Sequence, residues 1–258
     1  SLFQIANSTI RFWNSATLVD SMIGIGDVAS IMLNNLTFIQ LNDFAAASTL
    51  INVANSRVQL ASIQISGLQS SPLIYIRDGA QVSMESSNIN TNIIPSGGCL
   101  IQLDGFLVSL LINNSNISGN RAIGWTDDAV CPSPICVNSP SARLVLTNSI
   151  FSANKGLYGA VVAANMLLAQ TGILEDGKIV IQNCTFESND ATGAAGAIML
   201  TGGSLEITNS RFINNSCYEK GGAIWISQFV RASITSTLFL RNMVDYLDVP
   251  AIYGGALY

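Results

Sequence analysis

Residues 179–200 read IVIQNCTFESNDATGAAGAIML, and residues 205–226 read LEITNSRFINNSCYEKGGAIWI. When the second stretch is written below the first, IVI lies over LEI and the two phenylalanines coincide. In both stretches apolar and polar residues alternate ahead of the phenylalanine, which predicts a β-strand with one buried face. The chain therefore repeats a short strand-forming unit.

The same unit recurs along the whole chain at intervals of 24 to 35 residues. The position of the phenylalanine, taken as the anchor, is apolar in every unit: Ile10, Phe38, Ile65, Ile89, Ile117, Phe151, Phe186, Phe212 and Phe239. So is the position five residues earlier: Ile5, Leu33, Leu60, Met84, Ile112, Leu146, Ile181, Ile207 and Ile234. So is the position seven residues earlier: Phe3, Ile31, Val58, Val82, Leu110, Leu144, Ile179, Leu205 and Ala232. These three columns define one buried strand face per unit.

A unit of this size cannot bury its apolar face alone, so consecutive units must stack. Equivalent strands then pair in parallel about 4.8 Å apart, with right-handed crossovers. The sequence therefore predicts an all-β fold, a right-handed parallel β-helix of about nine coils with three short strands each, with phenylalanines stacked in the core. A leucine-rich horseshoe needs one strand and regular leucines per unit, and a β-propeller repeat is longer and antiparallel, so neither fits.

Two polar columns accompany the apolar ones. The position three residues before the anchor holds only asparagine and serine: Asn7, Asn35, Ser62, Ser86, Asn114, Asn148, Asn183, Asn209 and Ser236. These residue types suit tight corners, and their stacked amides are expected to form a hydrogen-bonded ladder. The predicted ladder residues are Asn114, Asn148, Asn183 and Asn209. A second polar column lies three residues after the anchor in the later units: Asn92, Asn120, Asn154, Asn189, Asn215 and Asn242.

Residues 1–258 are expected to form a single β-helix domain and to be a segment of a longer protein, since neither end resembles a natural terminus. Two units carry insertions, near residues 123–134 and 164–177. Insertions in solenoids form loops, often on one face. No membrane span is expected, because the longest uncharged stretch, residues 156–174, contains polar residues and three glycines.

The later units join F-x-x-N to a glycine-bearing turn: FSAN (151–154) to YGAV, FESN (186–189) to AGAI, FINN (212–215) to GGAI, and FLRN (239–242) to GGAL. This combination resembles the repeat of the polymorphic outer-membrane protein (Pmp) family, which occurs in chlamydial surface adhesins. The resemblance implies a pectin-lyase-like β-helix at the cell surface, used for adhesion or as structural material. It carries over no catalytic residue, because the motif is architectural.

Six N-x-S/T sequons are candidate N-glycosylation sites of a secreted protein: Asn7, Asn35, Asn113, Asn116, Asn183 and Asn214. Three of them, Asn7, Asn35 and Asn183, lie in the predicted ladder column and would carry no glycan if that column points inward. The better acceptors are then Asn113, Asn116 and Asn214.

The chain has five cysteines. Cys131 and Cys136, in the segment CPSPIC, are expected to close a small disulfide, the alternative being two free loop thiols. Cys99, Cys184 and Cys217 fall in different columns and are expected to be buried or lone thiols.

The composition excludes several functions. Hydrophobic residues make up 49% of the chain and charged residues 10%, which excludes disorder and argues against a helix-rich enzyme. A net charge of −5 disfavours binding to nucleic acid or to an anionic membrane. There is no histidine, so no mechanism within this chain uses imidazole. No cofactor or metal is expected.

A polysaccharide lyase or glycoside hydrolase of this fold is the less favoured alternative. A glycosidase needs two facing carboxylates, and a lyase would need Ca²⁺ held by several carboxylates. The acidic residues considered lie on outward columns of separate coils or in the insertions: Glu85, Glu187, Asp190, Glu206, Asp127, Asp128, Glu175 and Asp176. No catalytic residue is assigned.

The expected function is that of a non-enzymatic extracellular or cell-surface protein, part of a filament, fibre or surface layer. Open strand edges, few charges and a mean hydropathy of +0.42 favour contacts with other copies of the chain or with further repeats of the same protein. The alternative is an adhesin that binds surface glycans through the two insertions or through exposed Trp13, Trp125 and Trp225.

Overall fold

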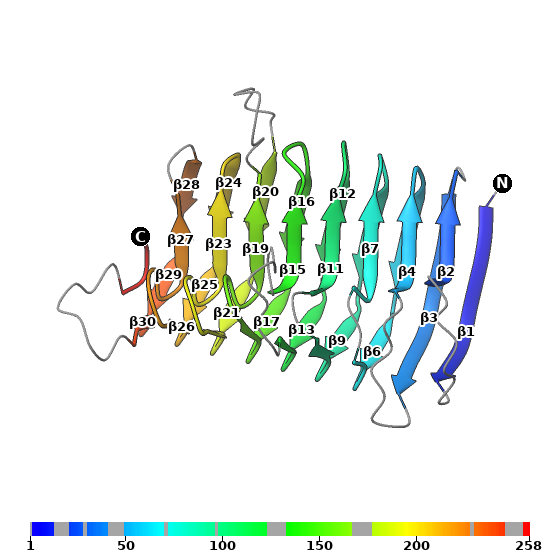
Figure 1. Ribbon diagram of the computed structural model, residues 1–258, viewed down its shortest axis with the longest axis horizontal. Helices are drawn as coiled ribbons and strands as arrows, with labels where there is room; N and C mark the ends of the chain where they lie inside the picture. Colours follow the sequence, from blue (N-terminus) through cyan, green and yellow to red (C-terminus); the bar gives the residue numbers. More distant parts are fainter. Residues whose placement is uncertain are drawn as a thin grey trace.

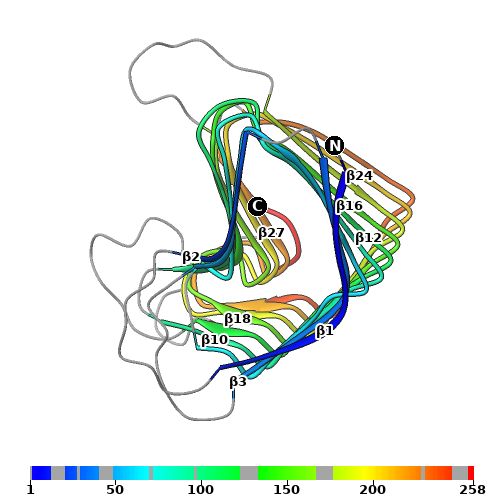
Figure 2. The same ribbon diagram turned by 90° about the vertical axis from the view of Figure 1, so that its right-hand side faces the viewer.

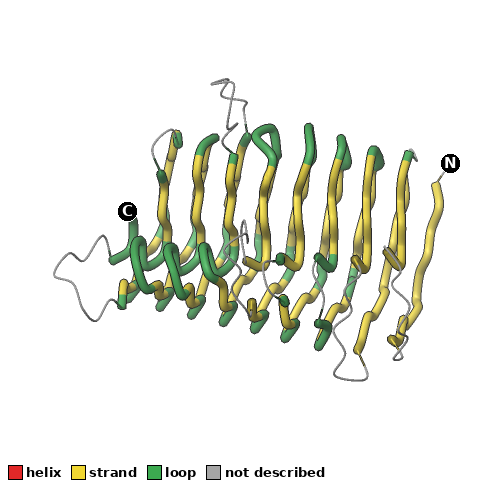
Figure 3. The backbone as a smooth tube through the Cα atoms, viewed as in Figure 1, coloured by secondary structure: helices red, strands yellow, loops and turns green. Residues whose placement is uncertain are grey.

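Figure 1 shows the computed structural model as a stack of short strands, with the chain progressing from one end of the stack to the other. The structure describes residues 2–12, 21–27, 30–40, 49–69, 72–95, 98–122, 133–166, 177–227, 230–245 and 255–258. Within these residues there is no helix, and strands alternate with short turns (Figure 3). Most of both predicted insertions, together with Trp13 and Trp125, lies outside the described residues.

Three parallel sheets run along the stack. The 16-stranded sheet contains one row formed by β1 (Leu2–Phe12), β3 (Ser30–Gln40), β5 (Arg57–Ala61), β8 (Gln81–Glu85), β12 (Ser109–Asn113), β16 (Arg143–Thr147), β20 (Lys178–Gln182), β24 (Ser204–Thr208) and β28 (Arg231–Thr235). Its other row, joined to the first through β3, is formed by β6 (Gln64–Ser66), β9 (Asn88–Asn90), β13 (Asn116–Ser118), β17 (Ile150–Ser152), β21 (Thr185–Glu187), β25 (Arg211–Ile213) and β29 (Leu238–Leu240).

The other two sheets close the cross-section around a common interior (Figure 2). The 8-stranded sheet contains β2 (Ser21–Gly26), β4 (Thr49–Ala54), β7 (Ile74–Arg77), β11 (Cys99–Asp104), β15 (Ser133–Asn138), β19 (Val162–Asn165), β23 (Ile198–Thr201) and β27 (Ile224–Ile226). The 6-stranded sheet contains β10 (Ile93–Ile94), β14 (Arg121–Ala122), β18 (Lys155–Gly156), β22 (Asp190–Ala191), β26 (Ser216–Cys217) and β30 (Met243–Val244). The predicted right-handed parallel β-helix is confirmed.

The strand register follows the predicted columns. Ile5 pairs with Leu33 at one end of the chain, and Ile181 pairs with Ile207 near the other. The anchor column forms the core: the rings of Phe151, Phe186, Phe212 and Phe239 stack with successive centroid distances of 4.9, 4.6 and 5.0 Å. The first three of these rings are fully buried. The predicted phenylalanine stack is therefore confirmed.

Left-handed backbone conformations make the corners. Ser86, with φ of 50°, separates β8 from β9, and Asn148, also with φ of 50°, separates β16 from β17. Because each such residue divides one bent layer into two short strands, many coils contain four strand segments in three sheets rather than the predicted three strands. Asparagine tolerates this conformation better than most residues do, which explains its use in the corner column.

The glycine-bearing turn is a requirement of close stacking. A Cβ atom on Gly196 would overlap the carbonyl oxygen of Gly222 and lie 2.7 Å from the backbone nitrogen of Ser216. A Cβ on Gly222 would similarly overlap the backbone of Gly255 in the next coil. The G-A-[IL] element thus permits one coil to lie directly on the next.

Candidate functional site: ladders, disulfide and surface asparagines

A buried asparagine ladder crosses the coils in the second polar column. It consists of Asn92, Asn120, Asn154, Asn189, Asn215 and Asn242, called here the inner ladder. The first five side chains are at most 1% exposed. From the sequence, this column is predicted only to be polar.

The four internal amides of the inner ladder, from Asn120 to Asn215, are fully used, as Asn120 illustrates. Its Nδ2 donates to Oδ1 of Asn154 at 3.0 Å and to the carbonyl oxygen of Ile89 at 3.0 Å. Its Oδ1 accepts from the backbone nitrogen and from Nδ2 of Asn92, at 3.1 and 2.9 Å. Since every donor has an acceptor, burial of the amide carries no penalty for unmade hydrogen bonds. All the amides point the same way, so neighbouring bonds polarise one another.

A shorter serine ladder lies next to the left-handed corner residues, one position later in the chain. Ser87, Ser115, Ser149 and Ser210 each donate the hydroxyl to the carbonyl oxygen two residues earlier. Each hydroxyl oxygen also accepts a hydrogen bond from a backbone nitrogen of the preceding coil. For example, the backbone nitrogen of Ser87 donates to Oγ of Ser115 at 3.1 Å. Cys184 takes the place of serine in this column and donates its thiol to the carbonyl oxygen of Gln182 at 3.3 Å.

The predicted ladder column lies on the outside of the molecule. Asn114, Asn148, Asn183 and Asn209 are exposed corner residues with φ between 49° and 54°. Their side chains make scattered bonds: Nδ2 of Asn183 donates to Oδ1 of Asn148 at 3.2 Å, but Nδ2 of Asn148 donates to Asn113 rather than to Asn114. The prediction of corners is confirmed. Of the predicted ladder, the structure shows the bond between Asn183 and Asn148, but Asn148 bonds to Asn113 in place of Asn114, because the left-handed conformation turns these side chains outward.

One signal in the sequence distinguishes the two columns. The inner ladder holds asparagine in all six of its units. The column three residues before the anchor, called here the outer column, also contains Ser62, Ser86 and Ser236. Only an amide can donate two hydrogen bonds and accept two, so a column without serine indicates the fully bonded, buried position.

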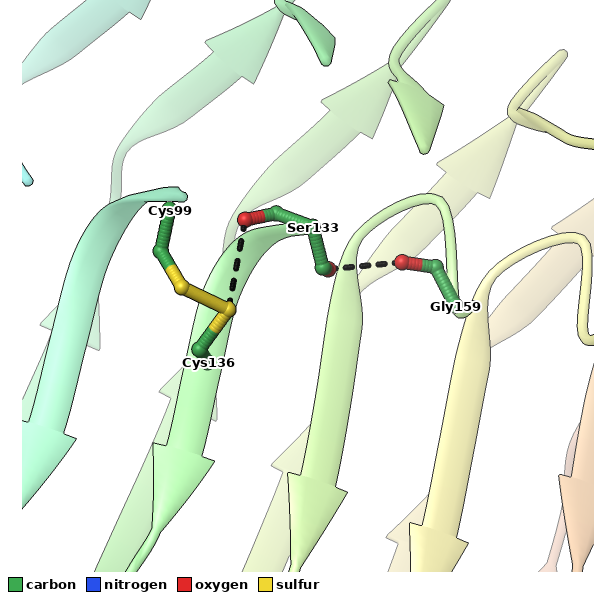
Figure 4. Close-up of a disulfide and its surroundings, with 4 residues drawn as sticks. All are labelled: Cys99, Ser133, Cys136 and Gly159. Atoms are coloured by element: carbon green, nitrogen blue, oxygen red, sulfur yellow. Dashed lines mark hydrogen bonds between the residues drawn. A yellow bond between two sulfur atoms is a disulfide. The ribbon is translucent and has the colours of Figure 1, made fainter. Parts of the chain in front are cut away.

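The disulfide joins Cys99 to Cys136, with 5.9 Å between the Cα atoms (Figure 4). The predicted pair Cys131–Cys136 is therefore wrong, and Cys131 itself lies outside the described residues. Cys99 and Cys136 come from the neighbouring strands β11 and β15, whose stacking brings them together across 37 residues of sequence. Beside this link, the hydroxyl of Ser133 donates to the carbonyl oxygen of Gly159 at 2.6 Å and ties β15 to the next coil.

Among the described residues, the buried free thiols are those of Cys184 and Cys217. Burial raises the pKa of Cys184 to about 11, although contacts with backbone groups of Ser149 and Gln182 oppose the shift. Burial also raises the pKa of Cys217. Both thiols therefore remain protonated and unreactive at neutral pH.

The sequons differ in accessibility. Asn35, Asn183 and Asn214 are exposed at corners, with φ of 51°, 54° and 53°. Asn113 is partly buried, and its Oδ1 accepts hydrogen bonds from Thr147 and Asn148, each at 2.9 Å. Asn116 is also partly buried, and its Oδ1 is enclosed without a partner. The side chain of Asn7 lies outside the described part of the chain.

This pattern changes the expected order of acceptors. The corner column that contains Asn35 and Asn183 points outward, contrary to the inward orientation considered from the sequence. The exposed sequon asparagines among the described side chains are therefore Asn35, Asn183 and Asn214, whereas Asn113 and Asn116 are partly buried in the surface of the sheet.

The described acidic side chains that were candidates for catalysis occupy separate places, and Asp127, Asp128, Glu175 and Asp176 lie outside the described residues. Asp190 lies 3.4 Å from Lys155, and Glu206 lies 2.7 Å from Lys178, both as surface ion pairs. Glu85 accepts from Nδ2 of Asn113 at 3.5 Å. Among the described residues, no three acidic or cysteine side chains form a group that suits a metal ion. Trp225 of β27 is partly buried and pairs in register with Met199.

One unit of the chain is similar to a repeat of a known protein family. Residues 209–227 match the model of the Chlamydia polymorphic membrane protein repeat. The match runs from the outer corner through Phe212 and the inner-ladder Asn215 to the glycine-bearing turn. These residues include the F-x-x-N and GGAI elements on which the predicted resemblance was based, so that resemblance is confirmed.

A transmembrane domain-containing protein of Dictyostelium discoideum is 26% identical to the chain over 273 residues. The alignment covers 97% of this chain and 15% of that relative, so the chain spans about 15% of the relative's length. None of the described residues belongs to a helix with the length and apolar character needed to cross a bilayer. Within its all-parallel β-helix, the chain thus contains a segment that matches the Chlamydia polymorphic membrane protein repeat.

Proposed function

We propose that the chain is a non-enzymatic β-helical module of an extracellular or cell-surface protein, structural and adhesive in role. The observation that carries the proposal is the inner ladder, which links the coils from Asn92 to Asn242. Such a ladder, together with the stacked phenylalanines, favours a stiff rod that holds a binding surface away from its point of attachment.

Two observations support the extracellular setting. The Cys99–Cys136 disulfide suits an oxidising compartment, since cytosolic thiols are kept reduced. The repeat matched at residues 209–227 is named for chlamydial membrane proteins, and the Dictyostelium relative is named as containing a transmembrane domain. We infer that this module is displayed by a longer protein at the cell surface.

The proposed partners are further repeats of the same protein and other copies of it. The sides of the β-helix carry exposed apolar side chains that favour lateral contacts. Phe106 and Leu107 are 62% and 73% exposed at one corner, and Ile150 is 50% exposed on the 16-stranded sheet. Association through these side chains is the expected route to a filament or surface layer.

Antibodies against the purified chain test the location. Cells that produce the full-length protein are labelled intact and after permeabilisation, with a cytosolic protein as the control for leakage. The proposal expects labelling of intact cells. Labelling that appears only after permeabilisation would refute it.

A further inference from the structure

A hollow of about 350 Å³ lies on the outer face of the 8-stranded sheet, over the ends of β2, β4 and β7. Its polar lining consists of Asp27, Asn52, Asn55, Arg77 and Asp78. All of these residues come from three successive coils, and none comes from the two insertions in which glycan recognition was expected.

Small residues create the space. Ile25 points into the core, so its neighbours Gly24 and Gly26 occupy outward positions of β2. The register places Gly26 beside Ala54 and Ala54 beside Arg77, so a glycine and an alanine lie next to a long side chain in one row. A Cβ atom on Gly26 would have no heavy atom within 4 Å, which confirms that this part of the face is open.

The polar groups around the hollow are held in place by one another. Nε of Arg77 donates to Oδ1 of Asn52 at 3.4 Å, and Nη1 of Arg77 lies 3.5 Å from Oδ2 of Asp78. Nδ2 of Asn55 donates to Oδ1 of Asp27 at 3.2 Å. Asp27, Asn55 and Asp78 adopt left-handed conformations at the same corner, with φ of 52°, 47° and 50°, so their side chains emerge side by side.

The network continues along the stack beyond the hollow. The guanidinium of Arg77 lies 5.9 Å from the centre of the Tyr75 ring. The hydroxyl of Tyr75 donates to Oδ2 of Asp104 in the next coil at 3.1 Å. An aromatic ring and a carboxylate therefore extend the polar lining by one coil, in the direction that an extended ligand would follow.

We propose that this hollow binds a neutral saccharide. Its volume suits a ligand of one or two sugar rings. Sugar hydroxyls both donate and accept, which matches a lining that mixes carboxylates, amides and a guanidinium. The two carboxylates outnumber the single guanidinium, so an acidic sugar would meet net repulsion. Coils repeat every 4.8 Å or so, a step close to one pyranose ring, and this spacing allows a linear chain to lie along the coils.

The inference deepens the adhesive part of the proposed function. It is tested on the purified chain, so a failure here would leave the result of the surface-labelling experiment standing. The probes are four neutral oligosaccharides (cellohexaose, laminarihexaose, mannohexaose and chitohexaose) and the acidic hexagalacturonate, each titrated by calorimetry and by ligand-observed NMR.

The decisive variant is Gly26→Leu, whose side chain would fill the hollow from an open position. Its control is Gln64→Leu, which adds the same side chain at an exposed position of the 16-stranded sheet. Asn52→Ala provides a second test that adds no bulk. Binding of at least one neutral probe is expected, weakened about tenfold or more by Gly26→Leu and by Asn52→Ala but not by Gln64→Leu. The proposal is overturned if no neutral probe binds, if both hollow variants bind normally, or if hexagalacturonate binds most tightly.

Discussion

Replacing Asn154 by serine is the most informative perturbation of the inner ladder. Its Nδ2 donates to the carbonyl oxygen of Ile117 at 2.9 Å and to Oδ1 of Asn189 at 3.0 Å. Its Oδ1 accepts from the backbone nitrogen of Asn120 at 3.2 Å and from Nδ2 of Asn120 at 3.0 Å. Serine is too short to replace these bonds, so the substitution removes four hydrogen bonds at a fully buried position.

The expected loss follows from these bonds. At about 1 kcal/mol of net stabilisation each, four bonds amount to about 4 kcal/mol. Two donors of Asn120 also remain buried without acceptors, which adds to the loss. With a urea m-value of about 3 kcal/mol/M, the unfolding midpoint should fall by somewhat more than 1 M.

The assay is urea unfolding followed by far-ultraviolet circular dichroism. The matched control is Asn148→Ser, which deletes the same atoms from an exposed corner column that already contains serine in other coils. This control should lose less than about 1 kcal/mol. Equal losses for the two variants would refute the distinction between the inner ladder and the outer column.

Three further experiments test other parts of the structure. Because burial raises the pKa of Cys184 to about 11, the unfolded chain loses this proton at a lower pH than the folded chain does, and the free energy of unfolding should fall as the pH rises from about 9 to about 11. Cys184→Ser, measured by thermal melting across this range, should remove the part of this fall that is due to Cys184. An unchanged pH profile would contradict the raised pKa of Cys184. Cys136→Ser should cost about 3 to 4 kcal/mol, since the link to Cys99 closes a loop of 37 residues, and non-reducing peptide mapping that found another partner for Cys136 would disprove the pairing. Gly222→Ala should lower the free energy of unfolding by about 3 kcal/mol or more, because the added Cβ would overlap the next coil. The control Gly26→Ala adds its Cβ to open space and should melt within a few degrees of the unsubstituted chain. Similar melting temperatures for the two variants would contradict the close stacking of the coils at Gly222.

The core was predictable because it is periodic. A buried strand face repeats every second residue, and in a solenoid the same face returns in each coil. The columns that contain Ile181 and Phe186 could therefore be aligned from the sequence, and the strand pairs reproduce that alignment. The phenylalanine stack followed from the same alignment.

The orientation of the polar columns was harder to predict. Asn148 and Asn154 lie on either side of the same anchor, and both recur with the same period. Their surroundings differ because Asn148 has a left-handed backbone, which turns its side chain outward. This left-handed conformation depends on how the whole coil packs, so it could not be predicted from the sequence near Asn148. The absence of serine from the inner ladder was the one signal in the sequence that its asparagines are buried.

The disulfide was missed because an insertion conceals the register. Cys99 follows the anchor Ile89 by ten residues, whereas its structural equivalent Ser133 follows the anchor Ile117 by sixteen. With the extra residues unplaced, proximity along the chain favoured Cys131–Cys136. Only the stacking of β15 on β11 brings Cys136 to Cys99.

Distances between spin labels test the stacked register most directly. Arg57, Arg143 and Arg231 occupy one column, separated by three coils in each step. Pulsed electron resonance on pairs of cysteine substitutions in this column should give about 14 Å for Arg57 with Arg143 and about 29 Å for Arg57 with Arg231, before allowance for the label linkers. Equal increments per coil would support a parallel β-helix; distances that do not grow with the number of coils between the labels would contradict it.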